Sequence, residues 1–295
     1  VSIPPQGYLL LFASGKNRIN PLAQLHTNFK LNQSAGYLAL VDSGTNIASE
    51  FAPLYPPQQE DSSYGRATGA PEVLGYFPSP TPGTANSNGG PGFAPQVSFS
   101  RSGGTMVSGF SLALTTASLS AVIHYTLDGS APTESSPVYA GPLSITTAVQ
   151  VRARAFESGL LPGPLRSESY VLLNANVINF TSDLPLLIIH NFGAGSVPAS
   201  QDQFASLSFF EPGASGKTSL TNSPTLIARA AINLRGSSTL GYPKSSFAVE
   251  FHDEFDANEN ISPLDLPAGD DWVLYAPNNF EPILVHNPLA FELSN

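Results

Sequence analysis

Glycine and proline interrupt this sequence so often that short strands joined by turns are favoured over helices. The chain contains 25 glycines and 27 prolines among 295 residues. Glycine weakens a helix through its backbone freedom, and proline removes a hydrogen-bond donor and clashes with the preceding turn. Hydrophobic residues still make up 41% of the chain, which is enough to form buried cores. We therefore expect a mainly β protein of two or three domains.

Short apolar runs, several of them alternating with polar residues, predict where the strands lie. The candidates are residues 8–13, 36–41, 97–99, 110–114, 122–126, 149–155, 186–189, 227–234, 247–251 and 272–275. Asp128-Gly129 predicts a turn, because glycine tolerates a positive φ. Residues 283–293 have the periodicity of a helix, although Pro288 fits a first helical turn better than a helix interior.

Turn-rich stretches divide the chain into three expected domains. The first covers residues 1–88 and is followed by a linker at 89–95, in a stretch rich in Pro, Gly, Ser and Asn. The second covers residues 96–173, where about seven short strands predict a small sandwich. The third covers residues 176–295. The sequence starts and stops as if inside a fold, so we expect it to be an internal fragment of a longer protein.

Charge and composition exclude several classes of partner. The formal net charge is −10, whereas nucleic-acid binders and proteins of anionic membrane surfaces carry clustered Lys and Arg. No run of eighteen apolar residues occurs, so we expect no membrane span. The chain has no cysteine, which removes disulfides, thiolate metal sites and a thiol nucleophile.

The first domain resembles the lamin-tail family found in exported bacterial proteins. The matching phrases are Gly7-Tyr8-Leu9-Leu10, His26-Thr27-Asn28-Phe29-Lys30-Leu31, Asp61-Ser62-Ser63-Tyr64-Gly65-Arg66 and Thr81-Pro82-Gly83-Thr84-Ala85-Asn86. The resemblance implies an immunoglobulin-like β-sandwich, whose opening strand is missing here, and no chemistry. His26 has no second ligand at metal spacing, so we expect a structural role for it. We expect Arg66 to brace a loop.

The second domain resembles the chitobiase or β-hexosaminidase C-terminal family. The phrase that carries this is Ile123-His124-Tyr125-Thr126-Leu127-Asp128-Gly129-Ser130-Ala131-Pro132-Thr133, followed by Val151-Arg152-Ala153-Arg154-Ala155 and Ser169-Tyr170-Val171. The resemblance implies a second immunoglobulin-like sandwich. Glycosidases need two catalytic carboxylates in a separate fold, and this domain does not supply them. Sugar binding through Tyr125 or Tyr139 is an alternative to their packing in the sandwich.

The third domain resembles the N-terminal part of the spore coat protein H (CotH) kinase-like family. Its phrases are Leu234-Arg235-Gly236-Ser237-Ser238-Thr239, Pro243-Lys244-Ser245-Ser246-Phe247, Asp271-Trp272-Val273-Leu274-Tyr275-Ala276-Pro277 and Asn287-Pro288-Leu289-Ala290-Phe291-Glu292-Leu293. The resemblance implies a truncated α+β kinase-like part, for which ATP and Mg²⁺ are the expected cofactors. The family's catalytic and metal-binding aspartates would follow Asn295, so we expect no catalytic or metal-binding residue in this chain.

Phosphoryl transfer needs a phosphate-binding loop, a lysine on the nucleotide and a carboxylate that orients this lysine. The resemblance assigns nucleotide binding to Lys244, Ser237, Ser238, Arg235 and Glu292. The alternatives are that Lys244 is a solvated hairpin lysine, that Arg235 only braces the loop, and that Glu292 is an exposed helix residue. Adjacent Asp270 and Asp271 point to opposite faces of a strand and make a poor metal pair. Residues 253–260 are expected to be a solvated hairpin tip and not a calcium loop.

The resemblances together predict an exported, secreted or cell-surface bacterial protein in which two accessory sandwiches accompany a CotH-like protein kinase domain. A protein phosphoacceptor and a cell-surface polysaccharide are the expected kinds of partner. The chain alone is predicted to be inactive, which leaves open whether the longer protein is an enzyme. The alternative is a non-enzymatic surface, adhesion or carbohydrate-targeting protein with a degenerate kinase-like scaffold.

Overall fold

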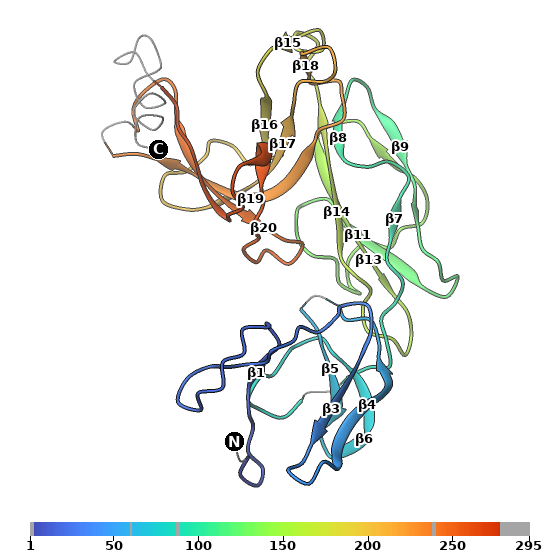
Figure 1. Cartoon of the computed structure of the whole chain (residues 1–295). Helices are drawn as coiled ribbons and strands as arrows, with labels where there is room; N and C mark the ends of the chain where they lie inside the picture. Colours follow the sequence, from blue (N-terminus) through green and yellow to red (C-terminus); the bar gives the residue numbers. More distant parts are fainter. Residues whose placement is uncertain (1–2, 60, 87–88, 238–239, 278–295) are drawn as a thin grey trace. The chain divides into compact units, whose positions relative to one another are not determined.

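The chain folds into two units in which almost all regular structure is β (Figure 1). The computed structural model describes residues 3–59, 61–86, 89–237 and 240–277. Unit 1 comprises Val1–Ala94 and Glu157–Pro162, and unit 2 comprises Pro95–Phe156 and Gly163–Asn295. The mainly β prediction is confirmed. None of the helical structure in these described ranges is long and apolar enough to cross a membrane.

The described residues of unit 1 form three two-stranded sheets. The strands are β1 (Leu11–Phe12), β2 (Leu25–His26), β3 (Gly36–Val41), β4 (Ile47–Tyr55), β5 (Ser63–Ala67) and β6 (Ala70–Phe77). The β1–β2 pair is parallel, and the β3–β4 and β5–β6 pairs are antiparallel. Strand β3 has the bounds that its apolar run predicts, whereas only two residues of the run at 8–13 form a strand.

A chain of aromatic rings, of which Tyr76 is buried, connects the strands of unit 1. Phe51, Tyr64, Tyr76 and Phe93 follow one another with centroids 5.7, 5.0 and 4.8 Å apart, a spacing at which aromatic pairs attract each other. Tyr76 also donates a hydrogen bond of 2.7 Å to the carbonyl of Pro57. These contacts join β4, β5 and β6 to the end of the unit's long first segment.

The two polar residues singled out in unit 1 both have structural roles. His26 is buried, stacks on Phe12 at 5.0 Å and shares a hydrogen bond of 2.8 Å between its Nδ1 and the Ser14 hydroxyl. Arg66 donates to the carbonyl of Pro71 at 2.7 Å and to that of Glu50 at 2.9 Å. The structure therefore confirms that Arg66 braces a loop and ties it to the neighbouring sheet.

The first half of unit 2 is a small β-sandwich (Figure 1). Its strands are β7 (Ser98–Phe99), β8 (Gly104–Met106), β9 (Phe110–Leu112), β10 (Leu114–Thr115), β11 (Val122–Thr126), β12 (Leu143–Ile145), β13 (Val149–Phe156) and β14 (Arg166–Leu172). The largest sheet has the order β11-β13-β14-β8, with β13 in an internal position. The predicted turn at Asp128-Gly129 follows β11, and Gly129 has a φ of 86°.

The two faces of β13 are buried for different reasons. Val151, Ala153 and Ala155 are fully buried and pack in the core of the sandwich. Since side chains alternate along a strand, Gln150 and Arg152 point to the opposite face. They are also buried, at 2% and 0% exposure. This second face is covered by the remainder of unit 2.

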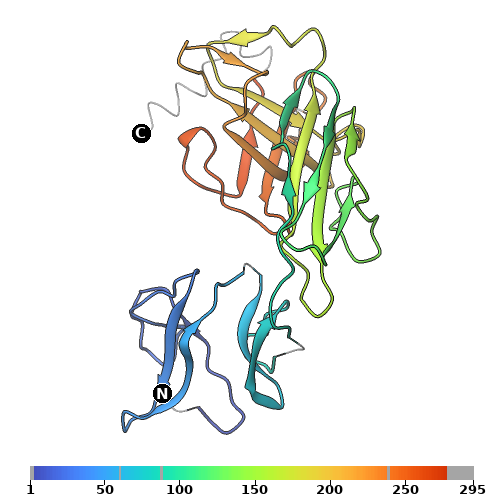
Figure 2. The same cartoon turned by 90° about the vertical axis from the view of Figure 1, so that its right-hand side faces the viewer.

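The second half of unit 2 is an antiparallel sheet of order β16-β17-β19-β20-β21. It consists of β16 (Leu186–His190), β17 (Gln203–Phe210), β19 (Leu226–Arg235), β20 (Ser246–His252) and β21 (Asp271–Leu274). The pair β15 (Thr181–Ser182) and β18 (Thr218–Ser219) and a 3-10 helix, η1 (Pro263–Asp265), accompany it. Figure 2 shows the orange strands of this sheet beside the green strands of the sandwich.

This sheet has one apolar face and one mixed face. Leu207, Phe209, Ile232, Val249 and Phe251 lie on the apolar face and are buried. The opposite face carries Ser206, Arg229 and His252, which are cross-strand neighbours, and it faces the sandwich.

The kinase-like third domain was expected to combine strands with a helix. The described residues from 176 to 277 contain strands and one turn of 3-10 helix. The predicted helix at 283–293 lies outside the described residues.

His190 ends β16 and predicts a specific pH dependence of stability. Its Nδ1 accepts a hydrogen bond of 3.0 Å from the Phe192 N–H, and burial lowers the pKa of His190 from 6.5. The unfolded state therefore binds a proton more readily than the folded state does. The contribution of His190 to the free energy of unfolding is complete above pH 6.5 and is lost as the pH falls through the pKa of the folded state. The variant His190→Asn, which cannot be protonated, should lose less stability than the wild type between pH 7 and pH 5 in urea unfolding. An equal loss in both proteins would contradict the assignment.

Candidate functional site

Three of the five residues predicted to bind nucleotide, Arg235, Ser237 and Lys244, lie in or beside the loop that joins β19 to β20. Arg235 is the last residue of β19 and pairs with Ser246, the first residue of β20. Ser237 and Lys244 therefore lie in a loop at the same end of the hairpin. Arg235, Ser237 and Lys244 are all exposed. Ser238 and Glu292 lie outside the described residues, so their assignment remains a prediction.

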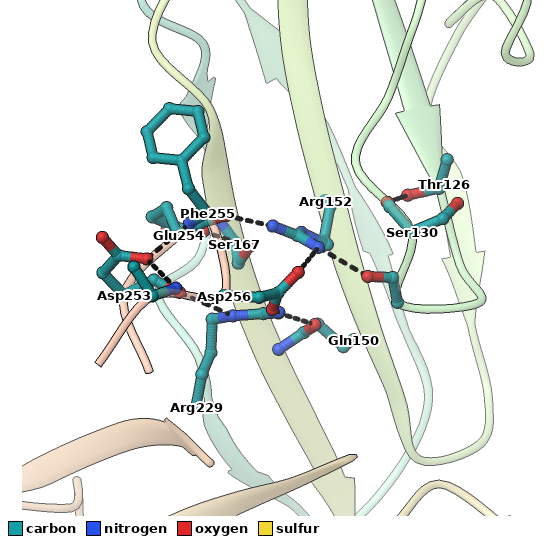
Figure 3. Close-up of polar contacts among 12 residues, drawn as sticks. Thr126, Ser130, Gln150, Arg152, Ser167, Arg229, Asp253, Glu254, Phe255 and Asp256 are labelled. Atoms are coloured by element: carbon teal, nitrogen blue, oxygen red, sulfur yellow. Dashed lines mark hydrogen bonds and ion pairs between the residues drawn. The ribbon is translucent and has the colours of Figure 1, made fainter. Parts of the chain in front are cut away.

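A buried polar site in unit 2 is centred on Arg152 of the sandwich (Figure 3). Its guanidinium donates to the carbonyl of Gly129 at 2.6 Å and to the carbonyl of Glu254. The same group forms an ion pair of 3.6 Å with Asp256. Gly129 belongs to the turn after β11, whereas Glu254 and Asp256 follow β20. Arg152 thus joins three separate segments of unit 2.

Arg229 of β19 approaches the same place from the sheet (Figure 3). It donates to the Gln150 side chain, to Asp256 and, at 3.1 Å, to the carbonyl of Asp253. Its guanidinium also lies 4.8 Å from the ring centroid of Phe204, a distance at which a cation is attracted to an aromatic face. Arg229 is 8% exposed. One carboxylate, that of Asp256, therefore bridges two buried arginines from different β layers.

The acidic residues that contact the arginines belong to the loop after β20, in which the predicted solvent exposure is confirmed for residues 255–260 but not for Asp253 and Glu254, which are half-buried. Residues 253–260 were expected to form a solvated hairpin tip. The carboxylate of Asp253 instead accepts the N–H groups of Phe255 and Ala257 at 2.8 and 2.9 Å, which shapes the loop. The Glu254 carboxylate accepts the Ser167 N–H at 2.8 Å and also the Ser167 hydroxyl. The tip remains exposed, but its base is bound to the sandwich.

The electrostatics of the cluster are consistent with a structural role. Burial and the neighbouring Arg229 lower the pKa of Arg152, whereas Asp256 and Glu254 oppose that change. A guanidinium remains charged under such perturbations because its ordinary pKa is above 12. Two buried cations would repel each other without the bridging carboxylate. Asp256 therefore makes the close approach of the two arginines tolerable.

A polar cleft of about 580 Å³ opens beside the cluster. It is lined by Gln150, residues 166–169, residues 226–229, residues 252–254 and residues 259–262. Burial raises the pKa of Glu168, against the opposing effects of the Gly103 N–H and of Arg166. The ranges described by the structure contain no group of three His, Cys, Asp or Glu side chains able to hold a metal. The geometry accounts for holding two β layers together.

The two tyrosines considered for sugar stacking are half-buried. The Tyr139 hydroxyl accepts the Leu114 N–H at 3.0 Å, and the Tyr125 N–H donates to the carbonyl of Pro137 at 3.0 Å. The large exposed apolar side chains of residues 95–173, all of which the structure describes, are aliphatic: Val107, Leu119, Val122, Leu127, Val138 and Leu172.

Sequence reasoning placed Arg152 in a strand but missed its partners. Part of the site could be inferred from the alternation of residues along this strand. Arg152 and Arg154 lie on one face of the strand, and its other face consists of Val151, Ala153 and Ala155. Only 12% of the residues in this chain are charged. Two arginines on an internal strand therefore indicate that buried hydrogen-bond acceptors lie nearby, because buried charges are costly unless they are paired. Which acceptors they are depends on contacts between residues about a hundred positions apart, and the sequence pattern does not contain that information.

Comparison with known proteins found a similarity for residues 101–165. Comparison with the curated proteins gave no match. The family model described as chitobiase/beta-hexosaminidase C-terminal domain matches residues 101–165. The matched range includes Gly129, Gln150 and Arg152 and excludes the partners of Arg152 after β20. In residues 101–165, the chain is thus similar to the chitobiase/beta-hexosaminidase C-terminal domain family.

Proposed function

We propose that the sandwich of unit 2 is an accessory domain that holds the sheet β16–β21 in place, and that this sheet begins an ATP-binding, CotH-like kinase domain of an exported protein. The observation that carries the accessory role is the cluster of Arg152 and Arg229 around Asp256. Buried charges are costly unless paired, so such a cluster fixes the orientation of the two layers. Positioning is also what a phosphoryl-transfer domain most needs from its surroundings.

The nucleotide part of the proposal rests on the β19–β20 hairpin. Its loop contains Gly236 and Gly241, the hydroxyl of Ser237 and the amine of Lys244, and Arg235 stands at its start. A glycine-containing hairpin loop lets the backbone approach phosphates, and a lysine at its end can neutralise them. Ser238 and Glu292 complete the proposed set. Mg²⁺ and the catalytic acids would come with residues that follow Asn295.

Lys244→Ala should weaken the binding of ATP–Mg²⁺ at least about tenfold, which corresponds to about 1.4 kcal/mol. Isothermal titration calorimetry on a version of the protein that continues past Asn295 measures this directly. Lys217→Ala is the matched control, because Lys217 is an exposed lysine of the same unit that pairs with Asp183 at 2.5 Å. An equal loss in both variants would assign the effect to net charge and not to the loop.

The competing function is a non-enzymatic surface, adhesion or carbohydrate-targeting protein in which the sheet is only a scaffold. The exposure of Arg235, Ser237 and Lys244 on one loop fits such a protein as well. Absence of ATP binding by the folded wild type that continues past Asn295 would favour this function. The chain of 295 residues alone should give no phosphotransfer above background, and a measurable rate would overturn the placement of the acids after Asn295.

A further inference from the structure

The polar cleft beside the arginine cluster is a second candidate site of unit 2. Its volume of about 580 Å³ lies within the usual range of small-molecule sites. It opens at the end of the β19–β20 hairpin where Arg229 pairs with His252, whereas the loop proposed to bind nucleotide begins at the pair of Arg235 and Ser246. Six residues of strand separate the two ends, which corresponds to about 20 Å. The cleft is therefore distinct from the nucleotide loop.

The described residues that line the cleft include more carboxylates than guanidiniums. The guanidiniums are those of Arg166 and Arg229, and the carboxylates are those of Glu168, Asp253, Glu254 and Glu259. The neighbouring ion pair of Arg152 and Asp256 adds one charge of each sign. An excess of two carboxylates therefore remains. Such a cleft attracts a cationic ligand and disfavours a ligand with a carboxylate or phosphate group.

Glu168 is the carboxylate of the cleft whose charge is least well compensated. Its side chain is 17% exposed, and its ion pair with Arg166, which is 42% exposed, is 3.5 Å long. Its other oxygen accepts the Gly103 N–H at 2.6 Å. Burial and the nearby Glu254 raise the pKa of Glu168 against these two partners, as happens when a carboxylate loses more hydration than its partners replace. The Glu254 carboxylate, by contrast, accepts both the N–H and the hydroxyl of Ser167.

We propose that the cleft binds an amino sugar, whose protonated amine pairs with Glu168 and whose hydroxyl groups contact the polar side chains around it. The exposed Asn260 amide and the half-buried His252 ring line the cleft, and both kinds of group exchange hydrogen bonds with hydroxyls. The half-buried Ile227 and Ile261 add apolar surface for the C–H groups of a sugar ring. A neutral sugar would leave Glu168 without a counter-charge, and a cation without hydroxyls would leave the other polar groups unmatched. This inference does not depend on nucleotide binding.

The first test compares ligands that differ in charge and in hydroxyl groups. Isothermal titration calorimetry of the full chain at about pH 6.5, where an amine of this kind is protonated, would use a tetrasaccharide of glucosamine. This ligand should bind at least about tenfold more tightly than its N-acetylated counterpart, which has no charge. It should also bind more tightly than spermidine, which has charge but no hydroxyl. Equal binding of either comparison ligand, or no binding of the glucosamine tetrasaccharide, would overturn the proposal.

The second test uses two variants with opposite expected effects. Glu168→Gln keeps the shape of the side chain and should weaken binding of the glucosamine tetrasaccharide at least about tenfold, whereas Glu134→Gln, at an exposed carboxylate of the same unit, should leave it unchanged.

Arg166→Met removes the cation that competes for Glu168 and should tighten binding about threefold, which is the scale of an exposed ion pair. Loss of folding cannot produce a gain of affinity, so this variant separates the proposal from a general defect. Lys217→Ala removes an exposed cation that pairs with Asp183 and should have no effect. Unchanged binding by Glu168→Gln, or weaker binding by Arg166→Met, would overturn the proposal.

Discussion

Replacing Arg152 with methionine is expected to lower the free energy of unfolding of unit 2 by about 3 kcal/mol. Methionine fills much of the volume but supplies no donor. The carbonyls of Gly129 and Glu254 then lose their partner, and Asp256 loses one of its two arginines. Asp256 is half-exposed and recovers some hydration, so most of the loss comes from the two carbonyls. Urea unfolding followed by far-UV circular dichroism measures the change.

Arg166→Met is the matched control for Arg152. Arg166 lies on the neighbouring strand β14, its side chain is 42% exposed, and its ion pair with Glu168 is 3.5 Å long. Exposed pairs of this kind contribute between zero and about 1 kcal/mol. A loss from Arg152→Met no larger than that from Arg166→Met would show that the buried cluster does not stabilise the unit.

Replacing Arg229 with methionine is expected to cost about 2 kcal/mol, since it removes one side of the same cluster and the cation over Phe204. Arg229 is 8% exposed whereas Arg152 is fully buried, so the groups left by Arg229 can regain more hydration and the loss should be smaller than for Arg152→Met. Arg229→Lys keeps the charge but loses the planar guanidinium that donates hydrogen bonds to Asp253, Gln150 and Asp256. Its free energy of unfolding should therefore fall nearly as much as that of Arg229→Met. Full stability of Arg229→Lys in urea unfolding would show that charge alone matters here.

The effects of Arg152→Met and Arg229→Met should not add. Both arginines share Asp256, and residues with a shared partner are energetically coupled. The double variant should therefore differ from the sum of the single variants by at least about 0.5 kcal/mol, which is the usual threshold for coupling. Additive losses would mean that the two arginines stabilise the unit independently.

Local patterns predicted the strands well because alternation is a property of the strand itself. Strand β11 (Val122–Thr126) has its predicted bounds, and β13 extends the predicted run by one residue to Phe156. At the N-terminus, only Leu11–Phe12 of the run at 8–13 forms a strand. An apolar run shows that a segment favours the β conformation, but whether it pairs depends on a partner elsewhere in the chain.

The cluster at Arg152 could not be predicted because its parts are distant in sequence. Ser167 contacts Glu254 across 87 positions, and Arg152 contacts Glu254 across 102. The charges of residues 253–260 suggested solvent exposure, which is the usual state of an acidic run. Two arginines from separate β layers provide the partners that hold the half-buried Glu254 and the exposed Asp256 against the sandwich. The nucleotide site at Arg235, Ser237, Ser238, Lys244 and Glu292 remains a prediction.

We expect the sandwich and the sheet β16–β21 to unfold as one unit, because the cluster around Arg152 and Arg229 joins them. Trp272 lies on β21 of the sheet, far along the sequence from Arg152 of the sandwich, and it is the only tryptophan of the chain. Urea unfolding of Arg152→Met, followed by Trp272 emission, tests the claim most directly. We predict that the Trp272 transition moves to a lower urea concentration together with the circular dichroism transition. A Trp272 transition that stays at the wild-type midpoint would show that the two layers unfold separately and would contradict the account.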